Sequence, residues 1–134
     1  MSDSDRSLPP SPYERMGGDA VVRALVDRFY ELMDTLPEAR DIRRMHAEDL
    51  SGARDKLFDF LSGWLGGPPR YVEKYGHPRL RARHLPFPIG VRERDQWLLC
   101  MERAMRDVGL PEDLQRQLRD AFFRTADHMR NQPD

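Results

Sequence analysis

Among the side chains that could do chemistry, His84 has the most informative neighbours. It would end a short helical turn that begins near Leu80, and the apolar residues Leu85 and Phe87 follow it. Arginines crowd the same segment, and nearby positive charge disfavours a protonated imidazole. We therefore expect a neutral ring that is able to ligate a metal. The alternative is a loop histidine whose ring bonds to the backbone.

The sequence offers no further ligands at a recognisable spacing that could hold a bare metal ion together with His84. The sequence has no His-x-x-x-His pair, no Cys-x-x-Cys pair and no acidic calcium loop, which are familiar spacings of metal ligands. Haem iron asks the protein for one ligand, because the porphyrin supplies the four equatorial bonds. Lys56 and Arg83 could then bind the haem propionates, and Phe87 would contact the cofactor beside His84. The alternative for both cations is a solvated surface position.

Three aromatic residues with polar tips form a second candidate group. Tyr30, His46 and Trp97 each lie on or beside an apolar stripe. Taken singly, each is expected to be a core aromatic residue whose polar tip finds a partner. Taken together with a haem, they would be three hydrogen-bond donors that converge on its ligand. Cys100, which follows Trp97 in the same stretch, is expected to pack as a small apolar side chain.

These residues fall on or between four helices that the apolar spacing predicts. Prolines divide the chain, and the proline-free stretches carry apolar residues at intervals of three and four, which is the pattern of a helix with one buried face. No stretch alternates with a period of two, so the predicted fold class is all-α. We expect Asp19 and Ser51 to cap the first two helices. The predicted helices are 19–35, 51–65, 91–108 and 112–130.

Shorter structures are expected to connect the long helices. Ser11 and Glu14 have the spacing of a capping box, with a proline between them, which predicts a short helix before the first long one. Residues 35–46 are expected to be irregular or a short helix. Residues 68–90 are too rich in proline for a long helix and leave room for one turn near 79–85. A connection this long in a small domain is unusual and indicates function.

The composition limits the classes of protein that remain. The 134 residues are expected to form one domain, with a flexible arm over 1–10 and a frayed end over 131–134. The chain is 39% hydrophobic and 34% charged, with a mean hydropathy of −0.77, so we expect no membrane span. A net charge of −1 argues against a nucleic-acid partner. The single cysteine and the polar amino terminus, which has no secretory pattern, indicate the cytoplasm.

Several motifs, in order along the chain, resemble the group II truncated haemoglobins. Two longer stretches, Gly76–Phe87 and Glu93–Met101, carry most of the resemblance. Shorter matches are Gly17–Gly18, Asp27–Tyr30 and Gly66–Pro68. One such motif alone would be weak evidence, whereas several in the family's order are specific. Together they cover the chain from about residue 11 to residue 130.

The resemblance implies a fold, a cofactor and positions around that cofactor. Members of the family form a truncated globin-like two-on-two helical sandwich around haem b, which matches four long helices in two antiparallel pairs. His84 falls at the position of the proximal iron ligand, and Tyr30 and Trp97 fall at distal positions. Ala53 and Leu57 fall on the distal helix over the haem.

The resemblance also implies residues at the edge of the haem and one departure from the family. The residues that fall where the family contacts or lies near the propionates are Lys56, Tyr71, His77 and Arg83. His46 falls at a distal position that is usually tyrosine or phenylalanine in this family. Histidine there changes the polarity that a ligand would meet, and the alternative is that His46 itself ligates the iron; we favour the hydrogen-bonding role.

The family and the polar distal residues together predict a function. We expect reversible binding of dioxygen and other diatomic ligands, including NO and CO, at a five-coordinate iron. Several hydrogen-bond donors imply slow ligand release, which favours sensing, scavenging or redox chemistry with NO or peroxide over bulk oxygen carriage. The chain is not expected to be an enzyme in its own right.

Two alternative functions stay open from the sequence. One is a haem peroxidase or NO dioxygenase, which would need an external reductase because 134 residues leave no room for a reductase domain. The other is a small helical interaction module without haem. The near-zero net charge leaves a homodimer open as well.

Overall fold

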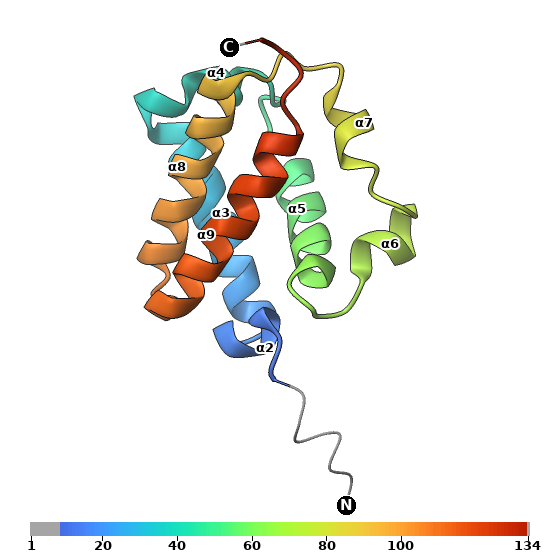
Figure 1. Ribbon diagram of the computed structural model, residues 1–134, viewed down its shortest axis with the longest axis vertical. Helices are drawn as coiled ribbons and strands as arrows, with labels where there is room; N and C mark the ends of the chain where they lie inside the picture. Colours follow the sequence, from blue (N-terminus) through green and yellow to red (C-terminus); the bar gives the residue numbers. More distant parts are fainter. Residues whose placement is uncertain (1–8, 134) are drawn as a thin grey trace, which may run out of the picture.

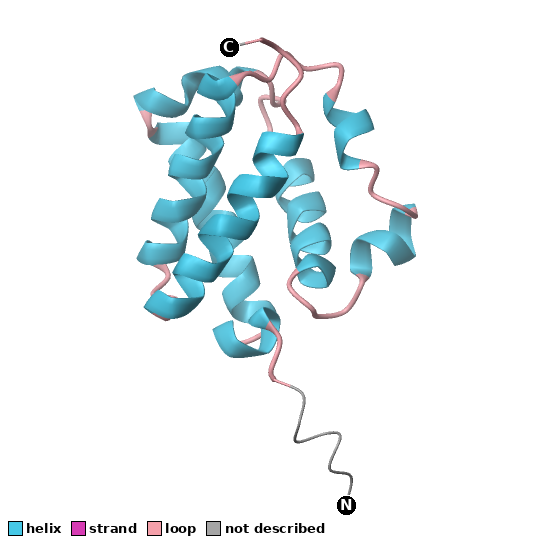
Figure 2. Ribbon diagram, viewed as in Figure 1, coloured by secondary structure: helices cyan, strands magenta, loops and turns pink. Residues whose placement is uncertain are grey.

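The computed structural model describes residues 9–133, and every regular element in that range is a helix (Figures 1 and 2). No strand occurs among these residues, in agreement with the predicted all-α class. Within the same range, no helix combines the length and the apolar character that crossing a membrane would require. The elements are α2 (Pro12–Met16), α3 (Asp19–Thr35), η1 (Pro37–Ala39), α4 (Arg40–Arg44), α5 (Ser51–Trp64), α6 (Arg70–Tyr75), α7 (Leu80–His84), α8 (Val91–Asp107) and α9 (Glu112–His128).

The four long helices occupy the stretches that the apolar spacing predicts, but Asp19 and Ser51 do not cap them as expected. Asp19 is the first residue of α3 and not its cap, because Gly18 takes that position. The Asp19 carboxylate instead accepts hydrogen bonds from the Tyr13 hydroxyl and from Arg70. Ser51 likewise begins α5, and its backbone N–H donates to the Asp49 carboxylate. Both predicted caps are therefore wrong.

The short helix α2 forms as the capping box predicts. The Ser11 hydroxyl accepts from the backbone N–H of Glu14, and the Glu14 carboxylate accepts from the backbone N–H of Ser11. Gly17 ends the helix in the left-handed region, with φ of 116°, where a residue with a side chain would be strained. This sharp stop lets α3 begin two residues later.

The segment from 68 to 90 holds two short helices where the sequence predicts one. The predicted turn near 79–85 is α7, and α6 was not expected. Helix α6 starts directly after Pro69, a residue that is tolerated at a helix start because it needs no N–H there. The ammonium of Lys74 in α6 lies 2.9 Å from the carboxylate of Asp59 in α5, whose side chain is only 4% exposed. This ion pair attaches the short helix to the long one.

Helix α3 lies at the centre of the packing. It contacts both α5 and α8, and α8 contacts α9, so that the long helices form the two pairs visible in Figure 1. The stripe expected to face inward on α3 is buried throughout, including Leu25, Phe29 and Met33. Several inward residues of α5 are only half-buried, among them Leu57, Phe60 and Trp64. These side chains border a hollow region instead of packing fully on other helices.

The expected frayed end over 131–134 is held in place for part of its length. The backbone N–H groups of Asn131 and Gln132 both donate to the carbonyl of Ile89, at 2.8 and 3.1 Å. Fraying is therefore wrong for these two residues, because the loop before α8 supplies the partner that a free end would lack. Residue 134 lies outside the described range, as do residues 1–8 of the expected arm.

Candidate haem site

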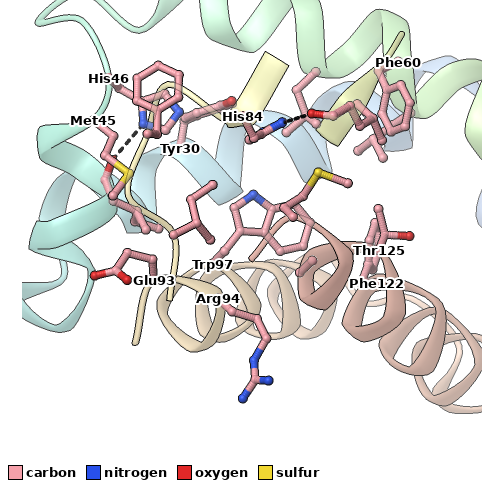
Figure 3. Close-up of a pocket in the computed structure, with 18 of the residues that line it drawn as sticks. Tyr30, Met45, His46, Phe60, His84, Glu93, Arg94, Trp97, Phe122 and Thr125 are labelled. Atoms are coloured by element: carbon pink, nitrogen blue, oxygen red, sulfur yellow. Dashed lines mark hydrogen bonds between the residues drawn. The ribbon is translucent and has the colours of Figure 1, made fainter. Parts of the chain in front are cut away.

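A cavity of about 290 Å³ is lined by residues of α3, α4, α5, α7, α8 and α9 (Figure 3). Its wall is mostly apolar and aromatic, as is usual for a cofactor or small-molecule site. The predicted residues His84, Tyr30, His46 and Trp97 all line it, and so do Leu57 and Phe87. Four of the residues singled out for their chemistry are thus brought together from four separate parts of the chain.

His84 ends α7 and turns one ring nitrogen away from the backbone. Its Nδ1 lies 2.6 Å from the carbonyl oxygen of Leu80, one turn earlier in the helix. A carbonyl can only accept, so Nδ1 carries the proton and the Nε2 lone pair of the neutral ring is left free. The predicted alternative, a histidine bonded to the backbone, is true of Nδ1 and still leaves Nε2 able to ligate iron.

Two residues that the sequence analysis did not single out hold α7 in position. The Arg81 guanidinium donates to the carbonyls of His128 and Arg130, at 2.6 and 2.8 Å, at the end of α9. The Asn131 amide donates to the carbonyls of His84 and Phe87. An arginine near a helix C-terminus is a recognised partner for its unpaired carbonyls, but the sequence does not reveal that Arg81 comes from another helix.

His46 has the same arrangement on the opposite side of the cavity. Its Nδ1 lies 2.8 Å from the carbonyl oxygen of Ile42, so Nδ1–H donates and Nε2 is left with its lone pair. Burial lowers the pKa of His46, and the charge of Arg43 lowers it further, although the bond to Ile42 acts in the other direction. The ring is therefore neutral near pH 7.

Tyr30 and Trp97 bring two further polar groups into the cavity. Neither the Tyr30 hydroxyl nor the Trp97 indole N–H has a hydrogen-bond partner among residues 9–133. Burial raises the pKa of Tyr30, so its hydroxyl keeps its proton. Trp97 packs between Phe29 and Phe122, with ring centroids 5.2 and 5.5 Å away. Figure 3 shows its nitrogen on the side of the ring that faces Tyr30 and His84.

The residues predicted at the propionates lie outside the cavity wall. Arg83 lies over the Tyr71 ring, at 5.9 Å, and its Nε donates to the carbonyl of Pro78. Lys56 lies over the ring of Tyr75, at 5.8 Å. These aromatic and cationic groups gather along the edge formed by α5, α6 and α7, where the assignment to propionates stays a prediction.

Two other predicted residues also lie apart from the cavity. His77 is exposed, and its Nδ1 accepts from the backbone N–H of Arg79. Ala53 is half-buried and packs against the core cluster without lining the cavity. The resemblance alone, and no feature of their own surroundings, had suggested them.

Much of the cavity wall comes from residues that were predicted only as core. The apolar spacing placed Phe60, Trp64 and Phe122 on inward faces, and Trp64 stacks on Phe122 with centroids 4.7 Å apart. Arg94 also lines the cavity and pairs with Asp127 at 2.8 Å. No sequence signal distinguishes this arginine from its exposed neighbours, because its partner lies on α9.

The donor set fits haem. A flat apolar cofactor suits the aromatic wall, His84 offers one nitrogen for its iron, and polar groups that have no partner among residues 9–133 line the same cavity. Haem needs no further protein ligand at its iron. An all-helical two-on-two sandwich with this cavity belongs to the class of truncated globins.

Comparisons with known proteins agree with this class. The family model of the bacterial-like globins matches residues 11–131. The group II 2-on-2 haemoglobin of Agrobacterium tumefaciens is 54% identical, with a TM-score of 0.90 over 93% of this chain and 97% of that one. The group 2 truncated haemoglobin YjbI of Bacillus subtilis is 44% identical over 124 residues, which are 92% of this chain and 91% of the relative.

A further solved structure that is similar is that of a truncated oxygen-avid haemoglobin from Bacillus subtilis. Its crystal structure is 43% identical, with a TM-score of 0.83 over 91% of this chain and all of that one. The chain described here belongs to the bacterial-like globin family and, within it, to the group II truncated haemoglobins. Membership implies that it binds haem and a ligand of haem.

Proposed function

We propose that this protein reversibly binds dioxygen and other diatomic ligands at a haem b held by His84. The observation that carries the proposal is the free Nε2 of His84, which lies on an apolar cavity that polar groups from other helices also line. When bound, haem supplies an iron whose remaining axial position accepts a diatomic ligand. The similarity to an oxygen-avid relative supports the same ligand class.

The residues of the chain perform three separate tasks in this proposal. His84 holds the cofactor, and the Leu80 carbonyl keeps its ring in the tautomer that leaves Nε2 free. The aromatic wall excludes water, which strengthens any hydrogen bond inside it. Trp97 donates through its indole N–H, and Tyr30 donates through its hydroxyl, to a ligand that carries partial negative charge.

Strong retention of the ligand follows from these donors. A protein that releases dioxygen slowly is poorly suited to bulk carriage, so sensing, scavenging or redox chemistry with NO or peroxide suits the site better. Turnover as a peroxidase or NO dioxygenase would need electrons from an external reductase. We therefore propose ligand binding as the function and treat catalysis as secondary.

The experiment begins with the absorption spectrum of the purified protein. We expect a Soret band with one haem per chain, and a ferrous form that takes up dioxygen and returns it under vacuum. His84→Gly should lose haem, and added imidazole should restore the band by replacing the missing side chain. A stoichiometric haem complex with an unchanged ferrous spectrum in His84→Gly would refute the assignment of His84.

A further inference from the structure

We propose that His46 serves as a hydrogen-bond acceptor in the cavity, so that the site favours ligands that carry a hydrogen which they can donate. Hydrosulfide and hydroperoxide belong to this protic class, whereas dioxygen, CO and fluoride do not. The inference rests on the proposed haem site and names a ligand class for it.

The tautomer of His46 follows from its contact with the backbone. The Ile42 carbonyl, 2.8 Å from Nδ1, has only lone pairs to offer. A neutral imidazole has one N–H, and the contact requires that N–H at Nδ1. Nε2 is therefore a lone pair at the cavity wall, on the side of the ring away from the Ile42 carbonyl (Figure 3).

The carbonyl that selects this tautomer is itself fixed. The backbone N–H of Ile42 donates to the Gln96 side chain at 3.2 Å, and the Gln96 amide donates to the Asp41 carboxylate at 2.7 Å. Ile42 is buried. The turn that carries the carbonyl is thus held from α8, which keeps the acceptor in place for Nδ1 of His46.

Nε2 of His46 has no donor within reach among the described residues. The nearest aromatic neighbour is Tyr30, whose ring meets the His46 ring edge to face with centroids 5.8 Å apart, and no hydrogen bond joins the two. When haem fills the cavity and displaces water from it, a lone pair left there without a donor would cost free energy. Any ligand that brings a hydrogen to it removes that cost.

The polar groups of the cavity therefore have complementary roles. Trp97 can only donate, Tyr30 can donate or accept, and His46 accepts in its neutral form. An aprotic ligand can pair with the two donors and leaves Nε2 unpaired. A protic ligand can accept from Trp97 or Tyr30 and at the same time donate to His46. The expectation of three converging donors is replaced by two donors and one acceptor.

The tautomer is tested directly by nitrogen NMR of the holoprotein. The ferrous CO form is diamagnetic, and histidine labelled with ¹⁵N separates a protonated from an unprotonated ring nitrogen. We expect a protonated Nδ1 and an unprotonated Nε2 for His46 at pH 8, with the signal assigned by its loss in His46→Phe. A protonated Nε2 would overturn the proposal.

The ligand preference is tested with a protic and an aprotic probe on the ferric holoprotein at pH 8. Sodium sulfide supplies hydrosulfide, and sodium fluoride supplies an aprotic anion. In His46→Phe, the ratio of the hydrosulfide affinity to the fluoride affinity should fall about tenfold. Bound hydrosulfide loses its hydrogen bond to His46, whereas bound fluoride no longer faces an unpaired lone pair.

The matched control is Arg44→Ala, which changes an exposed residue of the same short helix, α4, and should leave the ratio as it is. A ratio that stays within about twofold in His46→Phe would refute the proposal while leaving the haem site intact. Absence of a Soret band in the wild-type protein would instead refute the proposed function. If His46→Phe does not fold, His46→Leu serves both for the assignment of the NMR signal and for the affinity ratio.

Discussion

His84 and His46 each donate from Nδ1 to the carbonyl of the residue four positions earlier, Leu80 and Ile42. This one contact sets the chemistry of the opposite nitrogen, because a neutral ring has a single proton to place. The same local geometry thus makes one residue a candidate iron ligand and the other an acceptor for what the iron binds.

Trp97 is expected to slow ligand release through its indole N–H. Trp97→Phe keeps an aromatic ring between Phe29 and Phe122 but removes the donor. The dissociation rate of dioxygen should rise about tenfold, the value of one hydrogen bond in a dry site. Stopped-flow replacement of dioxygen by CO measures this rate.

Trp64→Phe is the matched control, since Trp64 lines the same cavity from α5 and its replacement leaves Trp97 unchanged. We expect a smaller effect. Equal rates in both variants would mean that the cavity volume, and not the donor, controls release.

Cys100 is expected to be chemically inert in the folded protein. Burial raises the pKa of its thiol to about 11, and the side chain is fully buried. Iodoacetamide at pH 8 should leave the native thiol unmodified and label it readily in urea, because the thiolate is the reactive form. Rapid labelling of the native protein would contradict this.

The sign of the pH effect on stability follows from the same residue. Between its unfolded pKa, near 9, and about 11, the unfolded chain loses the Cys100 proton while the folded chain keeps it. The free energy of unfolding should therefore fall as the pH rises through this interval, and a Cys100→Ala variant should show a weaker fall.

The sequence predicts the cavity residues better than it predicts their protons. Tyr30 and Trp97 could be assigned to the interior because the helical period places them on apolar stripes. The tautomer of His46 could not, since it depends on a turn held by Gln96 from another helix. The apolar period likewise could not predict whether Ala53 and Tyr71 line the cavity, because it shows which face of a helix is buried but not which residues lie against that face.

At the scale of the elements, α6 and α7 depend on contacts with the long helices. Helices of five or six residues are marginal in isolation, so tertiary partners must supply their stability. For α6 the main polar partner is Asp59, and for α7 it is the end of α9, reached by Arg81. Such contacts are long-range, so the proline spacing, which left room for one turn near 79–85, could not indicate α6.

The Lys74–Asp59 ion pair is expected to hold α6 on α5. Lys74→Met leaves the buried Asp59 carboxylate without its cation, and an unpaired buried charge is strongly unfavourable. Hydrogen exchange of the amides over 70–75 should accelerate about tenfold, because the local opening of α6 becomes easier.

Asp59→Asn is the control for this prediction. It removes the same ion pair but leaves no buried charge, because the lysine that remains is exposed. Hydrogen exchange over 70–75 should therefore accelerate less than in Lys74→Met. Equal acceleration in the two variants would indicate that desolvation of Asp59 is unimportant.

Gly67 is expected to be required for the close approach of α2 to the end of α5. A Cβ atom at this position would lie 2.5 Å from the Tyr13 ring. The Tyr13 hydroxyl donates a hydrogen bond to the Asp19 carboxylate, which limits how far the ring can move. Gly67→Ala should lower the free energy of unfolding by about 1–3 kcal/mol through overpacking. Urea denaturation measures the change.

The matched control is the same glycine-to-alanine substitution at Gly52 in α5. A Cβ there meets nothing within 4 Å, so Gly52→Ala should raise the free energy of unfolding by about 0.5–1 kcal/mol through backbone entropy. The same sign of change in both variants would contradict the proposed contact with Tyr13.

At the scale of the whole molecule, the low apolar content and the cavity have one explanation. A chain that is 39% hydrophobic leaves Leu57, Phe60 and Trp64 half-buried around an interior space. Haem would cover these side chains and complete the core. The composition shows that apolar residues are few, whereas the place and size of the space follow only from the packing of the helices.

Removal of haem is expected to lower the thermal stability of the protein. A ligand that binds only the native state stabilises it by about 2.7 kcal/mol at a free concentration one hundred times its Kd. For a chain of this length the corresponding shift in Tm is about 10 °C. Calorimetry of apoprotein and holoprotein measures it, and equal Tm values would refute haem as part of the core.

The contacts of Asn131 bear on the order in which the site can be assembled during translation. The segment from His84 to Ile89 leaves the ribosome well before Asn131, which follows Ile89 by 42 positions. Until then the turn that carries His84 lacks the partners that fix it. We expect a nascent chain to acquire its cofactor at native affinity only after this late segment has emerged, although most of the cavity wall has already been synthesised.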